Sequence, residues 1–524
     1  MPPTVRNARK VLAVFPRFSP CFASFHHAFP FFPGTTAFMP PQGILTVAAY
    51  LPSSWQVRVV DENVSPLTRE DLEWADAVLV SGMHVQRRRM AEIAQLAHAA
   101  GKLAIAGGSS VSGCPEYHPD FDLLQIGELG DSTDEIIRYL DDTTERPPEQ
   151  LVFTTSKRLD IDDFPIPAYD KVNLHAYMVL NIQWGSGCPF TCEFCDIPEL
   201  YGRKTRTKSI PRLVAELDAL MAQRPVGGIW FVDDNLIGDK KAAKKLMPHL
   251  IEWQGRTNYQ MRLTGEATIN LAEDPDLLEQ MREAYFTDMF LGIETPDLDT
   301  LKTISKRQNT RQPILESIAT LNRYGIEVAT GIIFGFDGET EDHAERAIRF
   351  VEASNIPIAV LNVLYALPRT PLHRRLSAAG RLRDEEVGGS NIVFEQPNEV
   401  IAAQLRRAVD ELYNPRAVYS RFHHQARHTY PNRKSLPLSR FPLSSPAVRF
   451  GATALSRVLW RIGARSNHKR EFWKIARELT QEGRIDHLLY IGAMGHHFTR
   501  YREDVLAGRI AESTFSHREG AMAS

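Results

Sequence analysis

The chain has 524 residues, of which 43% are hydrophobic and 24% charged, and its formal net charge is only −3. This length exceeds a single hydrophobic core and predicts about three or four domains of roughly 100–200 residues each. The near-neutral charge excludes a general electrostatic attraction to nucleic acid, and the absence of any run of about 18 apolar residues predicts no membrane-spanning helix. Five cysteines, an odd number, argue against a disulfide framework and predict a reducing, cytoplasmic location.

Residues 1–145 alternate short apolar runs with helical stretches, which predicts a doubly wound α/β domain around a parallel sheet. Five buried strands are expected, at 10–15, 57–63, 77–83, 102–108 and 123–129. Ligands of such sheets bind outside the carboxyl ends of the strands. The turns at those ends contain Ser81, Gly82, Met83, Gly107, Gly108, Ser109, Gly127 and Glu128. Glycines there also suit ordinary tight turns, so a ligand site and a purely structural role both remain open.

A change of composition separates this region from the next. Residues 146–176 are rich in proline and acidic residues, which predicts a linker with little regular structure. In residues 177–375 a second alternating series begins, with strands expected at 178–184, 227–235, 261–270, 288–295, 327–336 and 358–368. Six strand–helix units in succession predict a partial (β/α)6 barrel, whose chemistry would be located at the carboxyl ends of the strands. The polar side chains expected there include Asp233, Asp234, Glu266, Glu294 and Thr295.

The last part of the chain, residues 376–524, is expected to be mainly helical. Its segment 412–470 contains no Asp or Glu but twelve Lys or Arg. Within it, 421–441 is predicted to be loop and 447–465 a basic amphipathic helix. Two interpretations remain open: a helix lying in a membrane interface, or a solvated basic face against an acidic neighbour.

Three of the five cysteines, Cys188, Cys192 and Cys195, lie within eight residues. Chance clustering of this kind is an event of order one in ten thousand. A structural zinc site needs four ligands, but the loop has no histidine and the nearest other cysteine is Cys114. Three thiolates can instead hold three irons of a four-iron cluster and leave the fourth iron open. Phe194 would shield such a cluster from water.

The spacing C-x-x-x-C-x-x-C after the first barrel strand, with an aromatic residue before the last Cys, resembles the radical SAM enzymes. The resemblance implies a 4Fe-4S cluster on the three cysteines and S-adenosylmethionine (SAM) bound at the open iron, cleaved there to methionine and a 5′-deoxyadenosyl radical. It implies SAM contacts at Phe194, Asp233, Asp234, Glu266, Glu294, Thr295, Gly331, Ile333 and Gly335. One departure is FVDDN at 231–235, where the family usually has Gly-Gly-Glu, and it leaves the partner of the methionine amino group undefined.

An α/β domain ahead of such a barrel resembles the Rossmann-like cobalamin-binding module of the cobalamin-dependent subclass. The turn residues named above, from Ser81 to Glu128, would then bind cobalamin. The D-x-H-x-x-G motif that supplies histidine to cobalt is absent, since 61–66 reads DENVSP. His84, after the third strand, is the nearest histidine of note, and we expect it to form hydrogen bonds rather than to bind cobalt.

Within the subclass, PPQGILTVAAYLP, CDIPELYGR and ALPRTPL resemble the hopanoid C-2 methylases. This implies a cobalamin-dependent radical SAM C-methyltransferase that acts on an unactivated carbon, C-2 of a hopanoid; methylation or oxidative rearrangement of another natural-product scaffold is the alternative. We identify no catalytic side chain, because the cofactors would carry the difficult step. The implied partners are a lipid-like small molecule, an electron donor such as flavodoxin or ferredoxin, and a peripheral contact at the inner membrane face, with no nucleic acid.

Overall fold

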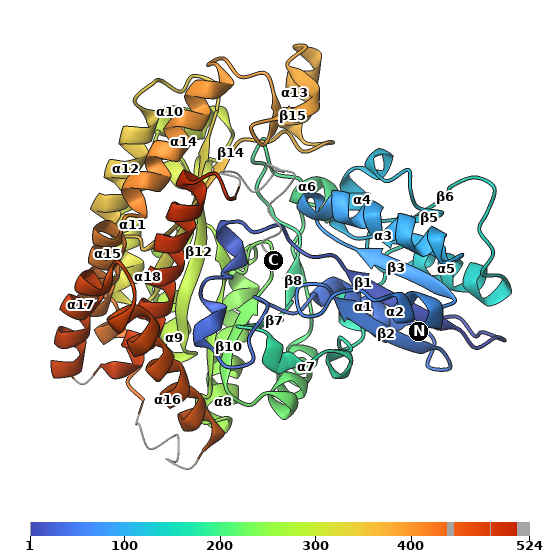
Figure 1. Ribbon diagram of the computed structural model, residues 1–524, viewed down its shortest axis with the longest axis horizontal. Helices are drawn as coiled ribbons and strands as arrows, with labels where there is room; N and C mark the ends of the chain where they lie inside the picture. Colours follow the sequence, from blue (N-terminus) through green and yellow to red (C-terminus); the bar gives the residue numbers. More distant parts are fainter. Residues whose placement is uncertain (1, 437–444, 483, 511–524) are drawn as a thin grey trace.

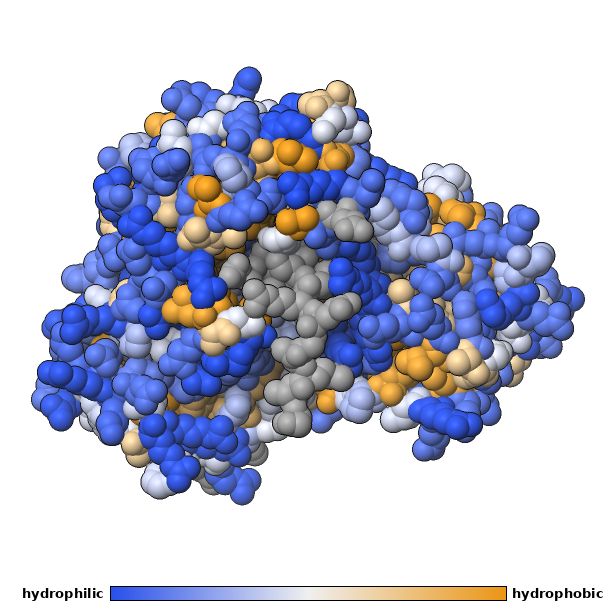
Figure 2. Space-filling model, turned by 45° about the horizontal axis from the view of Figure 1, so that its top comes forward, coloured by the Kyte–Doolittle hydropathy of each residue, from blue (hydrophilic) through white to orange (hydrophobic). Residues whose placement is uncertain are grey.

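The computed structural model of the chain describes residues 2–436, 445–482 and 484–510. Two parallel sheets form the centres of two lobes of unequal size, and the N-terminal sheet belongs to the smaller lobe (Figure 1). The face seen in Figure 2 is mostly hydrophilic, and its apolar groups form separate patches. None of the described helices is long and apolar enough to cross a bilayer.

The N-terminal sheet has six parallel strands in the order β2-β1-β3-β4-β5-β6. They are β1 (Lys10–Phe15), β2 (Gln56–Asp61), β3 (Ala77–Ser81), β4 (Leu103–Gly107), β5 (Leu123–Ile126) and β6 (Leu151–Thr154). The connecting helices are α1 (Gln42–Tyr50), α2 (Arg69–Trp74), α3 (Arg87–Ala99), α4 (Ser109–Gly113) and α5 (Asp131–Asp142). Separate hydrophobic clusters lie on the two faces of the sheet. The predicted doubly wound α/β fold is confirmed.

The sixth strand is a departure from the expected linker at 146–176. β6 pairs with β5 in parallel, with Leu151 opposite Leu123. It is a four-residue edge strand whose Leu151 and Val152 remain 36% and 52% exposed. Such a short strand buries little apolar surface, so its sequence lacks the apolar run that identified the other five.

The second sheet contains six parallel strands in sequential order, from β7 to β14, and forms the predicted partial barrel. They are β7 (Leu180–Ile182), β10 (Gly227–Phe231), β11 (Met261–Ala267), β12 (Phe286–Glu294), β13 (Glu327–Phe334) and β14 (Ile358–Val363). The helices packed on it are α7 (Ile210–Gln223), α8 (Lys240–Arg256), α9 (Pro275–Glu283), α10 (Leu298–Thr303), α11 (Ile314–Arg323) and α12 (His343–Ser354).

The C-terminal region is mainly helical, as predicted, and covers the barrel helices on one side (Figure 1). It contains α13 (Pro371–Ala378), the hairpin β15 (Leu382–Val387) and β16 (Ser390–Ile392), α14 (Asn398–Leu412), α15 (Pro415–His428), α16 (Pro446–Val458), the π-helix η12 (Leu459–Ala464), α17 (Lys469–Gln481) and α18 (Ile485–Leu506). Barrel and helical region share one continuous hydrophobic cluster. They therefore form a single packed body.

The segment 421–441 was expected to be loop, but its first eight residues belong to α15. Asn414 caps this helix by accepting the N–H of Ala417 at 3.0 Å, and Val418 and Phe422 are buried on its apolar face. The prediction was wrong here because the histidines and arginines obscured that helical spacing. Residues 437–441 lie outside the described chain. The segment 447–465 is helical, as predicted.

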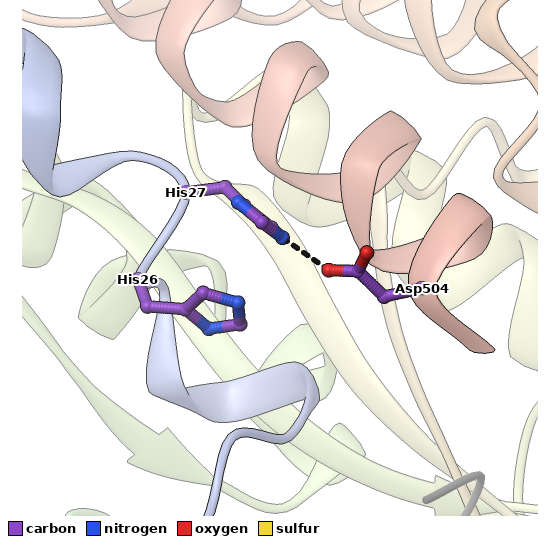
Figure 3. A group of neighbouring side chains, drawn as sticks. All are labelled: His26, His27 and Asp504. Atoms are coloured by element: carbon purple, nitrogen blue, oxygen red, sulfur yellow. Dashed lines mark hydrogen bonds and ion pairs between the residues drawn. The ribbon is translucent and has the colours of Figure 1, made fainter. Parts of the chain in front are cut away.

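The connection between β1 and α1, residues 16–41, reaches across to α18. Its His27 Nε2 lies 2.6 Å from Asp504 Oδ2, with His26 beside it (Figure 3). The ligand atoms of these three residues lie within 4.8 Å of one another. Arg509 lies 2.6 Å from the same carboxylate, however, and its charge opposes a bound cation. The group therefore acts as a contact that fixes the N-terminal segment against the helical region.

Candidate active site

The three neighbouring cysteines lie in the loop between β8 (Gly185–Ser186) and β9 (Arg206–Thr207), two short antiparallel strands. The backbone at the start of the loop passes close to the backbone at its end at Gly187, whose φ is +89°. A Cβ at this position would lie 2.9 Å from the backbone oxygens of Gly202 and Lys204. Both the positive φ and the close approach require glycine, so the shape of the loop depends on Gly187.

The three cysteine side chains lie near enough to one another in this loop for their charges to interact. Cys192 is buried, and Cys188 and Cys195 are partly buried. Burial raises the pKa of the Cys195 thiol, and the charges of Cys192 and Cys188 raise it further. Asn235 Nδ2 lies 4.0 Å from the sulfur of Cys188, and Gln308 Nε2 lies 3.6 Å from that of Cys192. Each amide can donate to a thiolate.

The arrangement fits a four-iron cluster better than a single metal ion. Within the described residues, only the His26 group places three candidate ligand atoms within 4.8 Å of one another, so the three sulfurs are spaced more widely than that. Cys114 does not complete such a group within the described residues, and its sulfur lies 3.8 Å from His84 Nδ1. A closed zinc site needs four close ligands. A cluster accommodates wider spacing, and donors to its sulfurs are a normal feature of such sites.

Two aspartates after β10 support the start of the cysteine loop. Asp233 is 3% exposed, and its carboxylate accepts the N–H groups of Trp184, at 3.1 Å, and of Gly185. Asp234 Oδ2 accepts the N–H of Gly187 at 2.7 Å. Burial raises the pKa of Asp233 to about 7 and that of Asp234 to about 6. Both carboxylates thus accept backbone N–H groups at the start of the cysteine loop.

A cavity of about 220 Å³ lies at the carboxyl ends of the later barrel strands. Its lining includes Phe194, Phe290, Glu294, Gly331, Ile333 and Tyr365. Four of these, Phe194, Glu294, Gly331 and Ile333, are residues that the resemblance assigned to SAM. They come from the cysteine loop and from two adjacent strands, so the fold brings together residues far apart in sequence.

Several acidic side chains lie near this cavity, at the carboxyl ends of the barrel strands. Glu294 has a φ of +67°, a strained conformation of the kind found at functional sites, and its carboxylate pairs with the buried Lys306. Burial raises the pKa of Glu266 to about 7, and the charges of Asp234 and Glu294 contribute. Lys306 pairs with Glu294 and Arg206 acts on Asp234, but the charges that act on Glu266 are those of carboxyl groups, an environment that favours a cationic ligand.

Two further predicted residues lie outside the cavity lining. Thr295 is fully buried, and its hydroxyl accepts the N–H of Asp297 at 3.2 Å. Gly335 has a φ of +103°, and its N–H donates to Glu339 at 2.8 Å. A Cβ on Gly335 would lie 2.6 Å from the ring of Phe394, so this glycine permits the β16 region to pack closely.

The smaller lobe presents its predicted ligand turns to the cysteine loop. Ser81 ends β3 and Gly82 and Met83 follow it, Gly107 ends β4 ahead of Gly108 and Ser109, and Gly127 and Glu128 follow β5. Helix α4 contacts α6 (Ile197–Leu200) of the cysteine loop. The carboxylate of Glu128 lies 2.6 Å from Arg206 Nη2 and 3.2 Å from Arg158 Nη1, so it links the two lobes.

His84 lies where this edge meets the barrel. It is buried, with Nε2 at 3.2 Å from the hydroxyl of Tyr365 and 3.1 Å from Arg87 Nη1. These contacts place it in a hydrogen-bonding network. Tyr365 also lines the barrel cavity, so its side chain contacts both this cavity and His84, which follows β3 of the smaller lobe.

Comparison with known proteins places this geometry in a family. The Radical SAM superfamily profile matches residues 182–351, and a domain of unknown function (DUF4070) matches residues 370–511. The hopanoid C-2 methylase of Rhodopseudomonas palustris (strain TIE-1) is 44% identical over 513 residues, which cover 98% of this chain and 97% of that protein. The chain belongs to the hopanoid C-2 methylase family of radical SAM enzymes.

Solved structures share the fold of this radical SAM family member. OxsB, a cobalamin-dependent S-adenosylmethionine radical enzyme with aqua-cobalamin and S-adenosylmethionine bound, is 14% identical, with a TM-score of 0.60 over 96% of this chain and 81% of its own. TsrM from Kitasatospora setae, a radical S-adenosylmethionine methyltransferase with cobalamin and a [4Fe-4S] cluster bound, is 13% identical, with a TM-score of 0.55 over 91% and 100%. At these identities the likeness shows the fold, and it confirms the predicted architecture.

Membership in the radical SAM family confirms the predicted enzyme class, a radical SAM methyltransferase, with its iron–sulfur cluster and SAM. The sequence interpretation did not assign the side chains nearest the sulfurs. Asn235 could have been found from its place directly after the two strand-end aspartates. Lys306 and Gln308 lie at a short 3₁₀ segment (Arg307–Thr310) that no apolar periodicity marks, so only the fold shows them.

Proposed function

We propose that the chain is a cobalamin-dependent radical SAM methyltransferase that adds a methyl group to C-2 of a hopanoid. The observation that carries this is the 44% identity to a hopanoid C-2 methylase along nearly the whole of both chains. A saturated ring carbon has no acidic proton, so side chains acting as acids or bases cannot activate it. Bound cofactors must supply that step, while the protein binds, orients and excludes water.

The chain's own residues provide a place for the cluster and for SAM. Cys188, Cys192 and Cys195 would hold the cluster, with Asp233 and Asp234 fixing the loop that carries them. SAM would contact Phe194, Glu294, Gly331 and Ile333 in the barrel cavity, with Glu266, Thr295 and Gly335 as the other predicted positions. SAM carries ammonium and sulfonium groups, which suit the acidic side chains near this cavity. When bound, cluster and SAM supply an organic radical, and cobalamin carries the methyl group.

Cobalamin would lie between the lobes, on the turns from Ser81 to Glu128. Support comes from the position of those turns, which face the cysteine loop, and from Tyr365, which contacts His84 on one side and the barrel cavity on the other. The residues there offer hydrogen-bonding groups and glycine-rich turns, which fit a large polar cofactor. His84 would donate or accept hydrogen bonds at this interface.

The proposal also includes two partners. An electron donor such as flavodoxin or ferredoxin would reduce the cluster. The enzyme would contact the inner membrane face peripherally, through the basic segment 412–470, because its substrate resides in a lipid phase. Each Lys or Arg near an anionic bilayer contributes about 1 kcal/mol to binding.

Expression in a hopanoid-producing bacterium that lacks a C-2 methylase of its own tests the function. The intact chain should produce 2-methylhopanoids, detected by mass spectrometry of the lipid extract, and the Cys192→Ala variant should produce none. If the intact protein cleaves SAM to 5′-deoxyadenosine in extracts of this host but leaves its hopanoids unmethylated, the substrate assignment is wrong. Another scaffold would then be the substrate.

A further inference from the structure

A second cavity, of about 310 Å³, lies in the C-terminal helical region and away from both cofactor sites. One wall is formed by η12 and the turn that leads to α17, and the other by α18. Its lining includes Arg461, Arg465, His468, His496, Arg500 and Glu503. Its volume is in the range typical of small-ligand pockets, roughly 300–1,000 Å³.

The pocket carries uncompensated positive charge. Its one carboxylate, Glu503, pairs with Arg500. No carboxylate in the described part of the chain forms an ion pair with Arg461 or Arg465, and both arginines are exposed to solvent. Two guanidinium groups are therefore available to an anion, and guanidinium groups are suited to bidentate binding of phosphate.

Two histidines form the inner wall. His468 is 2% exposed, and its Nε2 lies 3.2 Å from Nδ1 of His496. Burial and then the charge of Arg500 lower the pKa of His468 to about 4. Burial, with His468 and the nearby arginines, lowers that of His496 to about 3. Because one imidazole N–H is used between the two rings, the neutral pair retains one N–H that can donate to an oxyanion, and Ser466 and Asn467 add further polar groups to the lining.

Two exposed tryptophans lie on or against η12, which forms one wall of the pocket. Trp460 is 57% exposed, and the guanidinium of Arg465 lies 4.6 Å from its ring centre. Trp473 is 38% exposed and donates from Nε1 to the backbone oxygen of Gly463 at 2.8 Å. η12, which contains Trp460, is a six-residue π-helix, a rare geometry that is frequent at functional sites. Tryptophan beside arginine is typical of surfaces that sit at a membrane–water interface.

We propose that this pocket binds the phosphate of an anionic phospholipid headgroup and so docks the helical region on the membrane. The charge selects the anion, and the exposed tryptophans select a lipid over a soluble phosphate, because only a lipid brings an interface in which they can lie. The region 445–482 carries eight Lys or Arg against three Glu, which adds a diffuse attraction to the same surface. The inference deepens the proposed membrane contact, on which its choice of a lipid source rests.

The test compares two variants of the full chain that lose equal charge. Arg461→Gln/Arg465→Gln removes the two guanidinium groups of the pocket that form no ion pair with a carboxylate in the described part of the chain. Arg449→Gln/Lys474→Gln removes two exposed cations from the adjoining helices, α16 and α17, outside the pocket lining. Binding to phosphatidylcholine vesicles with and without phosphatidylglycerol is measured by flotation at low salt, without substrate. Titration with inorganic phosphate forms a second arm.

The control variant should lose about thirtyfold in affinity for phosphatidylglycerol vesicles, because two cations contribute about 1 kcal/mol each. The pocket variant should lose roughly three-hundredfold or more, because charge-assisted hydrogen bonds of about 1.5–3 kcal/mol are lost as well as charge. Equal losses in the two variants would overturn the pocket in favour of a diffuse basic face, and phosphate binding without vesicle binding would overturn the lipid source. A thermal unfolding temperature and a rate of SAM cleavage equal to those of the parent protein show that each variant is folded. If the double variant of the pocket does not fold, the single variant Arg461→Gln is tested in its place. Vesicle binding is measured without substrate, so its result does not depend on whether the enzyme methylates hopanoids. A failure of the pocket proposal is therefore distinguishable from a failure of the proposed function.

Discussion

The role of Asp233 separates two accounts of the active site, because the family pattern makes it a SAM contact while the structure makes it a support for the cysteine loop. Asp233→Asn leaves one oxygen for the N–H groups of Trp184 and Gly185 and points an amide N–H at the other. Charge-assisted hydrogen bonds are worth about 1.5–3 kcal/mol each. A loss of about 2–4 kcal/mol in the ordering of the loop should weaken cluster retention by roughly thirtyfold or more.

Iron retained by the reconstituted protein against increasing chelator measures this loss, with SAM affinity determined separately on protein that still holds its cluster. Asp299→Asn is the matched control, because its side chain is 91% exposed on α10 and its loss should leave iron retention unchanged. If Asp233→Asn retains iron like the parent protein but binds SAM much more weakly, the structural argument is refuted and Asp233 contacts SAM directly.

Three further changes follow from the same contacts. Gly187→Ala should prevent cluster assembly while most of the fold survives, since the new Cβ collides with backbone oxygens only in the cysteine loop; normal visible absorbance of the cluster would contradict this. Arg206→Gln breaks a partly buried contact with Glu128 between the lobes and should cost about 1–3 kcal/mol, so methyl transfer should fall while SAM cleavage continues; an equal fall in both would contradict it. Burial raises the pKa of Glu339 from about 4.5 to about 8, so the stability that its protonated form provides is present at low pH and is lost as pH rises through that range. Glu339→Gln should flatten this part of the dependence of unfolding free energy on pH, and an unchanged profile would contradict the shift.

The sequence predicts the two sheets well because their strands are buried on both faces and form continuous apolar runs. β6 lacks such a run, since Leu151 and Val152 at the edge remain exposed. The C-terminal part of α15, residues 421–428, was missed for the opposite reason: Val418 and Phe422 do mark the buried face of the helix, but basic residues dominate the segment. The sequence predicts an element well when the element is fully buried, and less well when one of its faces is exposed to solvent.

The candidate site also has a part that the sequence predicts and a part that it does not. The cysteine triplet is local in sequence, so its spacing alone identified the cluster chemistry. The contacts around it are not local: Gln308 reaches Cys192 across 116 positions, and Asp233 supports a loop 48 positions away. A strand-end position shows that a carboxylate lies near the site but not what it binds, because that depends on which backbone N–H groups the tertiary fold directs toward it.

Methyl transfer to a lipid carbon in a purified system tests the central claim most directly. The reconstituted enzyme, with cobalamin and a reductant, receives SAM labelled in its methyl group and a hopanoid in detergent or vesicles. The account predicts a labelled methyl group at C-2 of the hopanoid, formed together with 5′-deoxyadenosine and absent with Cys192→Ala. SAM cleavage in the presence of hopanoid, with no label in any lipid product, would contradict it.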